Sequence, residues 1–260
     1  MTDWLMRLDG KVVLITGASG GIGAACAAAL RARGARLSLT ARSGDKLKQV
    51  AGPDALFTAG DITDAAVRGR VVERTIERFG AIDVLLNNAG VGLYAPAWKA
   101  PLEETRAMFE LNVFAPLALT QLAAPHMRGR GGMIVNVGSI AGKVTLPWFT
   151  LYSSSKFALG SLSEGLRMEL KPQGIQVMLV CPGYVKTQFQ ENVLGGRPPA
   201  RLAARRRFAI TPEACAEAIV RGIERGARTV LTPRLGWLFV AAARVMPKFV
   251  ESMMSGMNGQ

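Results

Sequence analysis

The sequence predicts an α/β fold in which helices cover both faces of a doubly wound parallel sheet of about seven strands. The first observation behind this prediction is a series of short apolar runs, which begins with residues 11–16 and 35–40. The second is their spacing, because a stretch long enough for a helix separates successive runs. In such sheets, ligands gather at the carboxyl ends of the strands, near the point where strand order reverses.

The remaining elements follow the same alternation. The Ala-rich stretch 21–33 predicts the first helix, and later strands are predicted at residues 81–87, 131–137 and 175–181. Side chains that follow these runs should therefore lie together at one edge of the sheet. We look for the chemistry of the protein at that edge.

Length and composition favour one domain, residues 1–260, because 260 residues of which 49% are apolar can build one substantial core. Two segments near the end stand apart. Residues 188–210 have little periodicity and contain several glycines and prolines, which predicts a lid over a substrate. Residues 233–260 form an apolar and basic tail.

The formal net charge of +13 suggests an anionic partner, and its densest cluster lies in the predicted lid: Arg197, Arg201, Arg205, Arg206 and Arg207. This cluster is local, so we predict no nucleic-acid partner. Acidic lipid, a phosphorylated cofactor and an acidic carrier protein stay open.

Metal and disulfide chemistry are not predicted. Cys26, Cys181 and Cys215 are widely spaced and stand in apolar or Ala-rich surroundings, so each is interpreted as a small buried hydrophobe. His126 is the only histidine, which disfavours a histidine-centred metal site. The start of the chain has no signal-peptide pattern, and a cytoplasmic location is expected.

A glycine-rich segment, "TGASGGIG" at residues 16–23, follows the first strand and opens the first helix. Gly17, Gly21 and Gly23 would allow a tight turn and a close approach of the backbone to a pyrophosphate, whose charge the helix amino terminus stabilises. Ser19 and Ile22 belong to the same turn. These features predict a dinucleotide site in a Rossmann-type fold.

The end of the second strand indicates which dinucleotide binds. An Asp or Glu that would meet a free ribose diol is absent there, and Arg42 and Ser43 follow instead. A guanidinium can form charge-assisted hydrogen bonds with a 2'-phosphate, so NADP(H) is predicted over NAD(H). The alternative is that Arg42 is simply solvated.

A third strand is predicted between the second strand and residues 81–87, directly before "AGDIT" at residues 59–63, where Asp61 and Ile62 stand so that an adenine could be bracketed. An alternative role for Asp61 is a helix cap, because "DITD" precedes the next helical stretch. The fourth strand is followed by "NNAG", which brings Asn88, Ala89 and Gly90 to the same edge of the sheet.

Tyr152 stands four residues before Lys156, a spacing that places both side chains on one face of a helix. Ser139 ends the fifth strand, thirteen residues before the tyrosine. Lys156 should lower the pKa of Tyr152 from about 10 to near neutrality, which would make the phenol an acid or base for carbonyl and alcohol chemistry.

The chain resembles the short-chain dehydrogenase/reductase family over residues 11 to 231. The resemblance rests on motifs in the family's order: "TGASGGIG", "NNAG", Asn112, Ser139, "YSSSK" and "PGYVKT". Gly138 and Ala115 depart mildly from the family pattern, in which serine and glycine are frequent at these places.

The resemblance implies roles for several residues. Tyr152 would be the acid/base, Ser139 would hydrogen-bond the substrate oxygen, Lys156 would also hold the nicotinamide ribose, and Asn112 would keep a proton-relay water in place. The segment after the sixth strand would cover the nicotinamide through Pro182, Gly183, Val185 and Thr187.

The predicted function is reversible hydride transfer between NADP(H) and an apolar ketone or alcohol. Apolar side chains near the expected site could line a pocket for it: Leu93, Tyr94, Trp98, Leu146, Trp148 and Phe149. The basic lid keeps reduction of a 3-oxoacyl thioester as the alternative. A cofactor-binding redox sensor is the non-enzyme alternative.

Similar proteins pair through helices that correspond to residues 101–126 and 150–170, so a homodimer or homotetramer is expected. The tail contains "LGWLFVAAARVM", which is apolar but too short to span a bilayer. Peripheral contact with a membrane through this tail is a second expectation.

Overall fold

A computed structural model of the chain describes residues 5–196 and 209–255. Its centre is a seven-stranded sheet with the order β3-β2-β1-β4-β6-β7-β9, in which all neighbouring strands are parallel. The strands are β1 (Val12–Thr16), β2 (Arg36–Ala41), β3 (Leu56–Ala59), β4 (Val84–Asn87), β6 (Gly132–Val137), β7 (Ile175–Pro182) and β9 (Thr229–Thr232). The predicted fold class is confirmed. The arginine cluster of the predicted lid lies outside the described residues.

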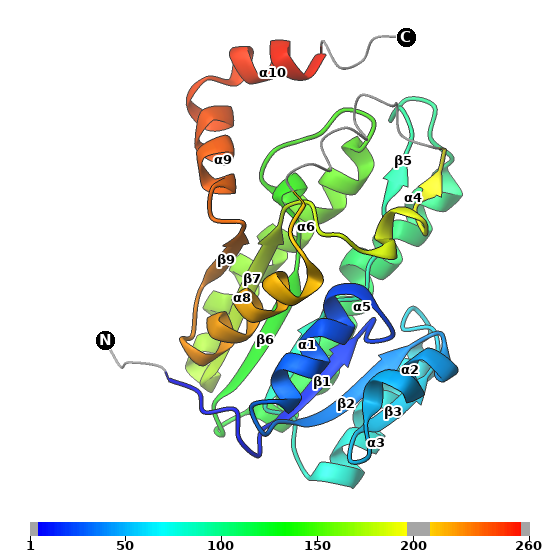
Figure 1. Ribbon diagram of the computed structural model, residues 1–260, viewed down its shortest axis with the longest axis vertical. Helices are drawn as coiled ribbons and strands as arrows, with labels where there is room; N and C mark the ends of the chain where they lie inside the picture. Colours follow the sequence, from blue (N-terminus) through cyan, green and yellow to red (C-terminus); the bar gives the residue numbers. More distant parts are fainter. Residues whose placement is uncertain (1–4, 197–208, 256–260) are drawn as a thin grey trace.

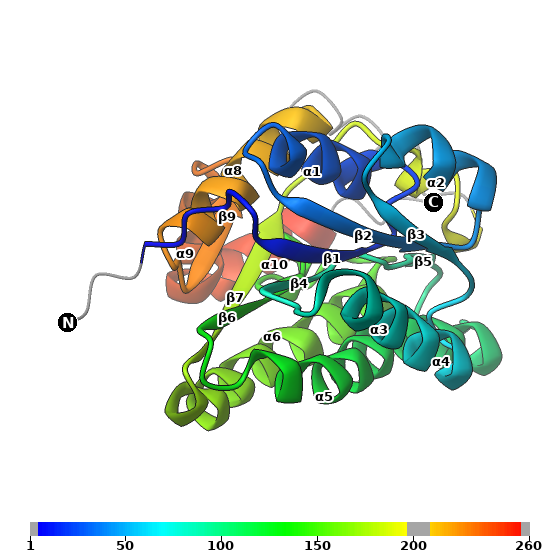
Figure 2. The same cartoon turned by 90° about the horizontal axis from the view of Figure 1, so that it is seen from below.

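Helices cover both faces of the sheet, as Figure 2 shows. One face carries α1 (Gly21–Arg31), α2 (Gly44–Ala51) and α8 (Pro212–Glu224). The other carries α3 (Ala65–Phe79), α4 (Leu102–Phe109), α5 (Ala115–Met127) and α6 (Thr150–Leu170). Figure 1 shows the same layers face on.

The sheet separates two hydrophobic cores because side chains alternate along each strand. In β1, Val13 and Ile15 belong to the core beneath α1, α2 and α8, whereas Leu14 belongs to the core beneath α3, α5 and α6. All three side chains are fully buried. A strand with two buried faces needs a continuous apolar sequence, which explains why the runs show no polar alternation.

The three cysteines, Cys26, Cys181 and Cys215, are buried and free, which confirms their interpretation as small core residues. Burial raises the pKa of the Cys181 thiol to about 11 and that of Cys215 to about 12. Thiolate chemistry near neutral pH is therefore disfavoured at both.

The stretch Leu102–Met127 is long and apolar enough, by length and composition, to cross a membrane. Its sequence has a different explanation in the fold. Leu119, Ala123 and Met127 of α5 are buried in the core beneath the sheet, so the apolar side of this stretch belongs to a helix that covers the sheet.

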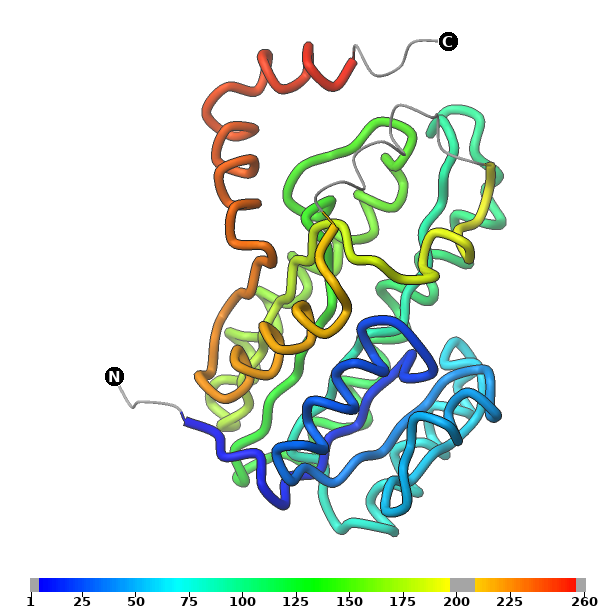
Figure 3. The backbone as a smooth tube through the Cα atoms, viewed as in Figure 1, coloured from blue at the N-terminus to red at the C-terminus, as the bar shows by residue number. Residues whose placement is uncertain are grey.

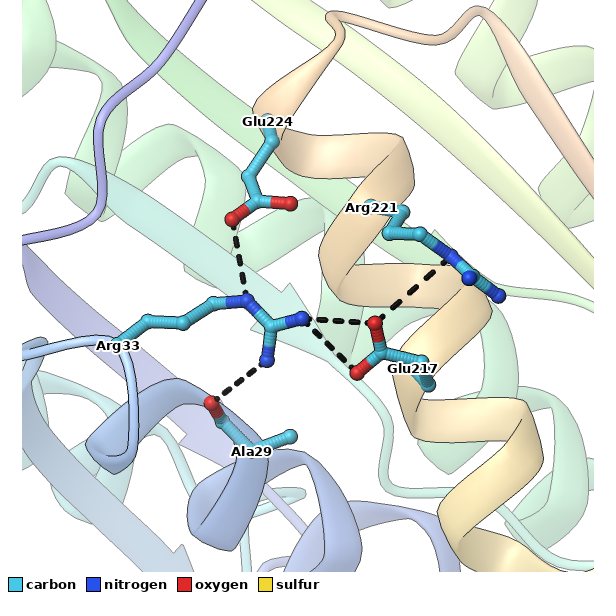
Figure 4. A network of polar contacts seen from close by, with 5 residues as sticks. All are labelled: Ala29, Arg33, Glu217, Arg221 and Glu224. Carbon is cyan, nitrogen blue, oxygen red and sulfur yellow. Dashed lines mark hydrogen bonds and ion pairs between the residues drawn. The ribbon is translucent and has the colours of Figure 1, made fainter.

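An ion-pair network fastens α1 to α8 (Figure 4). The guanidinium of Arg33, just beyond α1, donates to both carboxylate oxygens of Glu217 at 2.7 and 2.9 Å and to Glu224 at 3.0 Å. It also donates to the carbonyl of Ala29 at 3.1 Å. The hydrogen bonds to Glu217 raise the pKa of Arg33 above its usual value. This network holds the helix whose amino terminus lies at the glycine-rich turn.

Part of the predicted lid has a fixed place. Residues Gln188–Gln190 form a 3-10 turn, η4, and β8 (Leu194–Gly195) pairs in parallel with β5 (Leu93–Tyr94) in a small second sheet. In the tube of Figure 3, this yellow segment runs back beside the teal segment around residue 93. Residues 188–196 of the predicted lid are therefore attached to the body through the pairing of β8 with β5.

The tail forms two helices, α9 (Gly236–Val245) and α10 (Pro247–Ser255). Figure 1 shows that both extend beyond the layered body of the molecule. Val240 attaches α9 to a small core that also contains Leu231 of β9 and Val144.

Candidate active site

The glycine-rich turn lies where strand order reverses, because β1 has β2 on one side and β4 on the other. Gly17 has a positive φ of 65°, and a Cβ there would come within 2.9 Å of the Ala89 Cα. Only glycine suits this position, because both the dihedral angle and the close approach exclude a side chain.

Asn88 holds the turn in place. Its side-chain nitrogen donates to the carbonyls of Thr16 at 2.9 Å and Gly17 at 3.2 Å. The Thr16 hydroxyl in return accepts from the backbone nitrogens of Asn88 and Ala89, both at 3.0 Å. The "NNAG" motif therefore positions the turn through its backbone and amide groups.

The amino terminus of α1 is arranged to receive an anion. Gly21 has a φ of 54°, Gly20 has open space where a Cβ would be, and no acidic residue stands in the first turn of the helix. A Cβ on Gly23 would overlap the carbonyl of Gly17. Ser19 in the turn and Ile22 at the start of α1 are both partly exposed. These features fit a pyrophosphate.

Arg42 lies at the carboxyl end of β2, exposed, and makes no hydrogen bond or ion pair with the rest of the described chain. Ser43 caps α2 by accepting from the Lys46 nitrogen at 3.4 Å. Nearby, the hydroxyl of Thr40 and the amide oxygen of Asn87 are buried without a hydrogen-bond partner among the described residues. This edge therefore keeps polar groups that a dinucleotide could use.

Asp61 does not cap the helix that follows, so the alternative interpretation of this residue is wrong. The cap of α3 is Asp64, whose carboxylate accepts from the Ala66 nitrogen at 2.8 Å. Asp61 instead accepts from the backbone and hydroxyl of Thr63, at 2.9 and 2.8 Å. Ile62 is buried in the core beside α3.

The segment after β7 faces the glycine-rich turn. Pro182 is the last residue of β7, Gly183 donates to the carbonyl of Thr232 at 2.8 Å, and Val185 packs on the core beneath α1. A Cβ on Gly21 would lie 3.1 Å from the Thr187 methyl group. A groove of about 820 Å³, lined in part by Gly21 and Thr187, runs between α1 and the start of α8.

Asn112 lies in a π-helical turn, η1 (Glu110–Phe114), between α4 and α5. It is fully buried, and its amide exchanges two hydrogen bonds of 2.9 Å with the backbone of Val91. It also donates to the Ser155 hydroxyl at 3.0 Å. Such π-helical turns often occur at functional sites.

The spacing of Tyr152 and Lys156 brings both to one face of α6, as predicted, and Ser139 lies beside Tyr152. The side chains of Tyr152 and Lys156 lie on the buried face of α6, and Ser139 is near enough to the phenol to act on its pKa. Ser139 precedes a short 3-10 turn, η2 (Ile140–Gly142), and its hydroxyl accepts from the Ala141 nitrogen at 3.1 Å. A Cβ on Gly90 would lie 3.1 Å from the Asn112 amide oxygen and 3.4 Å from the Lys156 nitrogen. The residues that follow β4 and β6 therefore meet η1 and α6 here.

The predicted direction of the Tyr152 pKa shift is wrong for the chain without a bound cofactor, because the pKa is raised and not lowered. Burial raises the pKa of the phenol to about 12, and Ser139 only partly opposes this effect. Lys156 lies with its nitrogen 5.7 Å from the centre of the phenol ring and donates to the carbonyl of Val137 at 3.0 Å. Burial lowers the pKa of this ammonium to about 8. Desolvation by burial is the largest cause of both pKa shifts.

The apolar residues that were predicted to line a pocket differ in their burial. Leu93, Tyr94 and Phe149 are buried in one cluster with Tyr152, in which the Phe149 ring stacks on the rings of Tyr94 and Tyr152 at 4.3 and 4.2 Å. Trp98 is 79% exposed and lies outside this cluster. The sequence did not single out Phe189 of η4, whose ring lies 5.8 Å from that of Tyr152.

Trp148 adopts a positive φ of 63°, alone among the described residues other than glycine. The Phe149 nitrogen donates to the carbonyl of Leu146 at 3.1 Å, which closes a turn with Pro147 and Trp148 at its centre. A residue with positive φ at the second central position is typical of a type II turn, where glycine is usual. The backbone strain therefore lies directly before α6 and the site.

Comparison with known proteins agrees with this architecture. The family model for short chain dehydrogenases matches residues 11–197. The chain belongs to the short chain dehydrogenase family. The members of this family are oxidoreductases.

Two curated relatives cover nearly all of the chain. A ketoacyl reductase from a Nostoc species is 33% identical, over 95% of this chain and 89% of the relative. An 11-beta-hydroxysteroid dehydrogenase-like protein from Arabidopsis thaliana is 32% identical, over 95% of this chain and 82% of the relative.

Two solved structures have the same fold. A short chain dehydrogenase from Burkholderia cenocepacia in complex with NADP has a TM-score of 0.82 and 30% identity, covering 96% of this chain and 99% of the other. A family member from Burkholderia phymatum in complex with NAD has a TM-score of 0.86 and 25% identity, covering 94% and 96%. The family thus includes structures with either dinucleotide.

Proposed function

We propose that the chain transfers hydride reversibly between NADP(H) and the carbonyl or secondary alcohol of an apolar substrate. The observation that carries this proposal is the convergence of Ser139, Tyr152, Lys156 and Asn112 beside the glycine-rich turn. A buried phenol, a buried ammonium and a buried amide that meet at one sheet edge are costly to maintain without a use.

The residues of the chain supply the proton chemistry. The Tyr152 hydroxyl donates a proton to the substrate oxygen during reduction and accepts one during oxidation, while the Ser139 hydroxyl orients that oxygen. Lys156, with a pKa of about 8, exchanges a proton near neutral pH and can reload the site. A bound nicotinamide supplies or accepts the hydride.

Replacing Tyr152 tests this assignment. Tyr152→Phe should lower kcat by a factor of about 10³ to 10⁴, because it removes the acid/base, and should leave cofactor binding intact. Ser154→Ala, which changes an exposed hydroxyl on the same helix, is the matched control. Substantial turnover by Tyr152→Phe would refute the mechanism. A wild-type chain that binds cofactor but reduces no carbonyl would favour the redox sensor.

The preference for NADP(H) rests on Arg42, an exposed and unpaired cation at the end of β2. Arg42→Ala should weaken NADP(H) binding by about 10-fold to 100-fold, the value of a charged hydrogen bond, and leave NAD(H) binding unchanged. Lys48→Ala removes a nearby charge from α2 and is the control. An unchanged ratio of NADP to NAD affinity in Arg42→Ala would contradict the assignment.

The substrate class rests on the buried aromatic cluster around Tyr152 and on the name of the hydroxysteroid dehydrogenase-like relative. The ketoacyl reductase relative favours the alternative, a 3-oxoacyl thioester. A screen of NADPH oxidation with ketosteroids, aromatic ketones, aldehydes and 3-oxoacyl thioesters distinguishes them. A kcat/KM that is highest for the thioester would replace the apolar ketone by the alternative.

Self-association is also proposed, through the outer faces of α5 and α6. Large apolar side chains are exposed on these helices and at the end of η1, directly before α5: Leu122, Phe157, Met168 and Phe114. Sedimentation equilibrium should show a dimer or tetramer for the wild type and a smaller species for Phe157→Arg, because the charge would be buried in the contact. A monomeric wild type would exclude this proposal.

A further inference from the structure

The tail exposes more large apolar side chains than a soluble surface normally does. They stand on the loop before α9, on both helices and between them: Leu235, Trp237, Leu238, Val245, Met246, Phe249 and Met253. Exposure reaches 67% at Leu238 and 80% at Val245. These seven residues together are called the tail surface. A gathering of this kind marks a binding surface more often than scattered single residues do.

The packing of α9 on the body does not account for the tail surface. Val240, with Phe239 and Ala243 beside it, faces the small core of β9 and forms the inner side of the helix. Trp237, Leu238 and Val245 are exposed instead. The helix is therefore apolar on more than the face it buries, and the remaining face needs a cover of its own.

The charges around the tail surface are mostly positive. Arg234, Arg244 and Lys248 are exposed on the same two helices and the loop before them, against a single exposed carboxylate, Glu251. The whole chain carries +13. Apolar and aromatic residues flanked by cations are the composition of helices that lie in a membrane interface.

We propose that α9 and α10 dock the protein on the surface of an anionic phospholipid bilayer. The tail surface enters the boundary between headgroups and acyl chains, and the three cations lie at the level of the lipid phosphates. Neither helix can span the bilayer, because α9 has 10 residues and α10 has 9. The attachment is peripheral.

A second copy of the chain fits the tail surface less well. In a two-fold contact the same patch meets itself, so the basic residues of one copy would approach those of the other. Arg244 and Lys248 stand at the junction of the two helices, where such repulsion would be strong. Anionic lipid meets the same residues with complementary charge.

Docking would also bring the active site close to the bilayer. A Cβ on Gly236, the first residue of α9, would lie 3.1 Å from the Ile140 side chain, and Ile140 directly follows Ser139. The tail is thus attached to the loop that carries a predicted site residue. The proposal itself does not depend on hydride transfer.

Co-sedimentation of the full chain with lipid vesicles tests the proposal. Vesicles of phosphatidylcholine alone are compared with vesicles containing about 30% phosphatidylglycerol, at about 20 mM and about 0.5 M NaCl. The wild type should bind the anionic vesicles at low salt, and binding should weaken at high salt. The double variant Arg244→Gln with Lys248→Gln should lower the partition coefficient by about five-fold for each charge removed.

A matched pair of substitutions tests the apolar contribution. Leu238→Glu should lower partitioning by about tenfold or more, whereas Leu5→Glu should not change it. Leu5 lies near the amino terminus and is 76% exposed, against 67% for Leu238, so the two variants differ mainly in place. Circular dichroism melting verifies that each variant folds, and Phe249→Glu replaces Leu238→Glu if that variant does not.

Three outcomes would overturn the proposal. The wild type could fail to bind anionic vesicles at low salt, or Leu5→Glu could reduce binding as much as Leu238→Glu does. Light scattering without lipid could also show wild-type oligomers that Leu238→Glu alone dissociates. In that last case the tail surface would be a contact between copies of the chain.

Discussion

Helix α6 and the tail helices reverse the ordinary pattern of burial in opposite ways. On α6, Ser153, Ser155, Lys156 and Ser163 are buried although they are polar. In the tail, apolar residues such as Val245 are exposed. Either reversal costs stability, so each indicates a part of the surface or core that serves something other than folding.

The two regions differ in how the cost is met. The polar groups of α6 find partners within the chain: Ser155 donates to the Tyr152 carbonyl at 2.7 Å, and Ser163 accepts from Asn136 at 2.9 Å. The apolar groups of the tail surface stay exposed in this chain. The first region is complete as it stands, and the second requires a partner.

The largest effect that distinguishes the two regions is expected at Lys156. Its folded-state pKa of about 8 is lower than the usual 10.5, so burial of the ammonium destabilises the fold below pH 8. Between pH 8 and 10 the folded chain loses this proton before the unfolded chain does, and stability should rise by up to about 3 kcal/mol. Lys156→Met should lack this rise.

Urea unfolding of both proteins from pH 7 to pH 10 measures the difference. Above pH 10 the trend should turn, because the raised pKa of Tyr152, about 12, makes the folded chain retain a proton that the unfolded chain loses. Equal slopes of stability against pH in the two proteins would show that Lys156 is not desolvated.

A smaller effect is expected within the hydrogen-bond chain of α6. Ser163→Ala removes only the hydroxyl and leaves the Asn136 amide, which donates to that hydroxyl, without its acceptor in the core. The loss should be about 2 kcal/mol of unfolding free energy. Ser154→Ala, at an exposed position of the same helix, serves as the comparison, and a similar cost at both sites would mean that burial of the hydroxyl is irrelevant.

The ion-pair network between α1 and α8 should contribute less to the free energy of unfolding. Arg33→Ala removes the hydrogen bonds to Glu217 and Glu224, yet these side chains remain 27–38% exposed to water. A decrease of about 1 kcal/mol or less is expected, and it should shrink at high salt. Thermal melting at low and high ionic strength measures it. A loss of unfolding free energy several times larger would place this ion-pair network among the main determinants of stability.

The smallest effect is expected in the tail. Val245→Ser should change the free energy of unfolding by no more than about 0.5 kcal/mol, because the side chain is exposed in the folded chain. Chemical denaturation of the lipid-free protein tests this. A large loss of stability would show that Val245 packs within the chain, and the contrast with α6 would disappear.

Local patterns in the sequence were sufficient for much of the fold and the site. Continuous apolar runs identify strands with two buried faces, and the spacing of Tyr152 and Lys156 places both on one face of a helix. The glycines of the first turn are required by the backbone itself, so they also stand out in the sequence. The assigned roles of the site residues stay predictions.

Features that depend on distant contacts were not foreseen. β9 has only the residues Thr229–Thr232 and no apolar run, and β5 pairs with β8 across about a hundred residues of chain. The pKa of Tyr152 was predicted in the wrong direction because spacing shows the neighbouring charge but not the depth of burial. Asn112 was noticed only through resemblance to the family, and its π-helical turn has no local signature.

The π-helical turn η1 makes the number of residues between α4 and α5 as important as which residues they are. Each residue of an α-helix advances the chain by about 100°, so deleting one residue from η1 would join α4 and α5 in a single regular register. Either the amide of Asn112 would swing away from Val91 or α4 would rotate against its neighbours. Libraries of single-codon deletions should therefore find this stretch intolerant even where individual side chains can be exchanged.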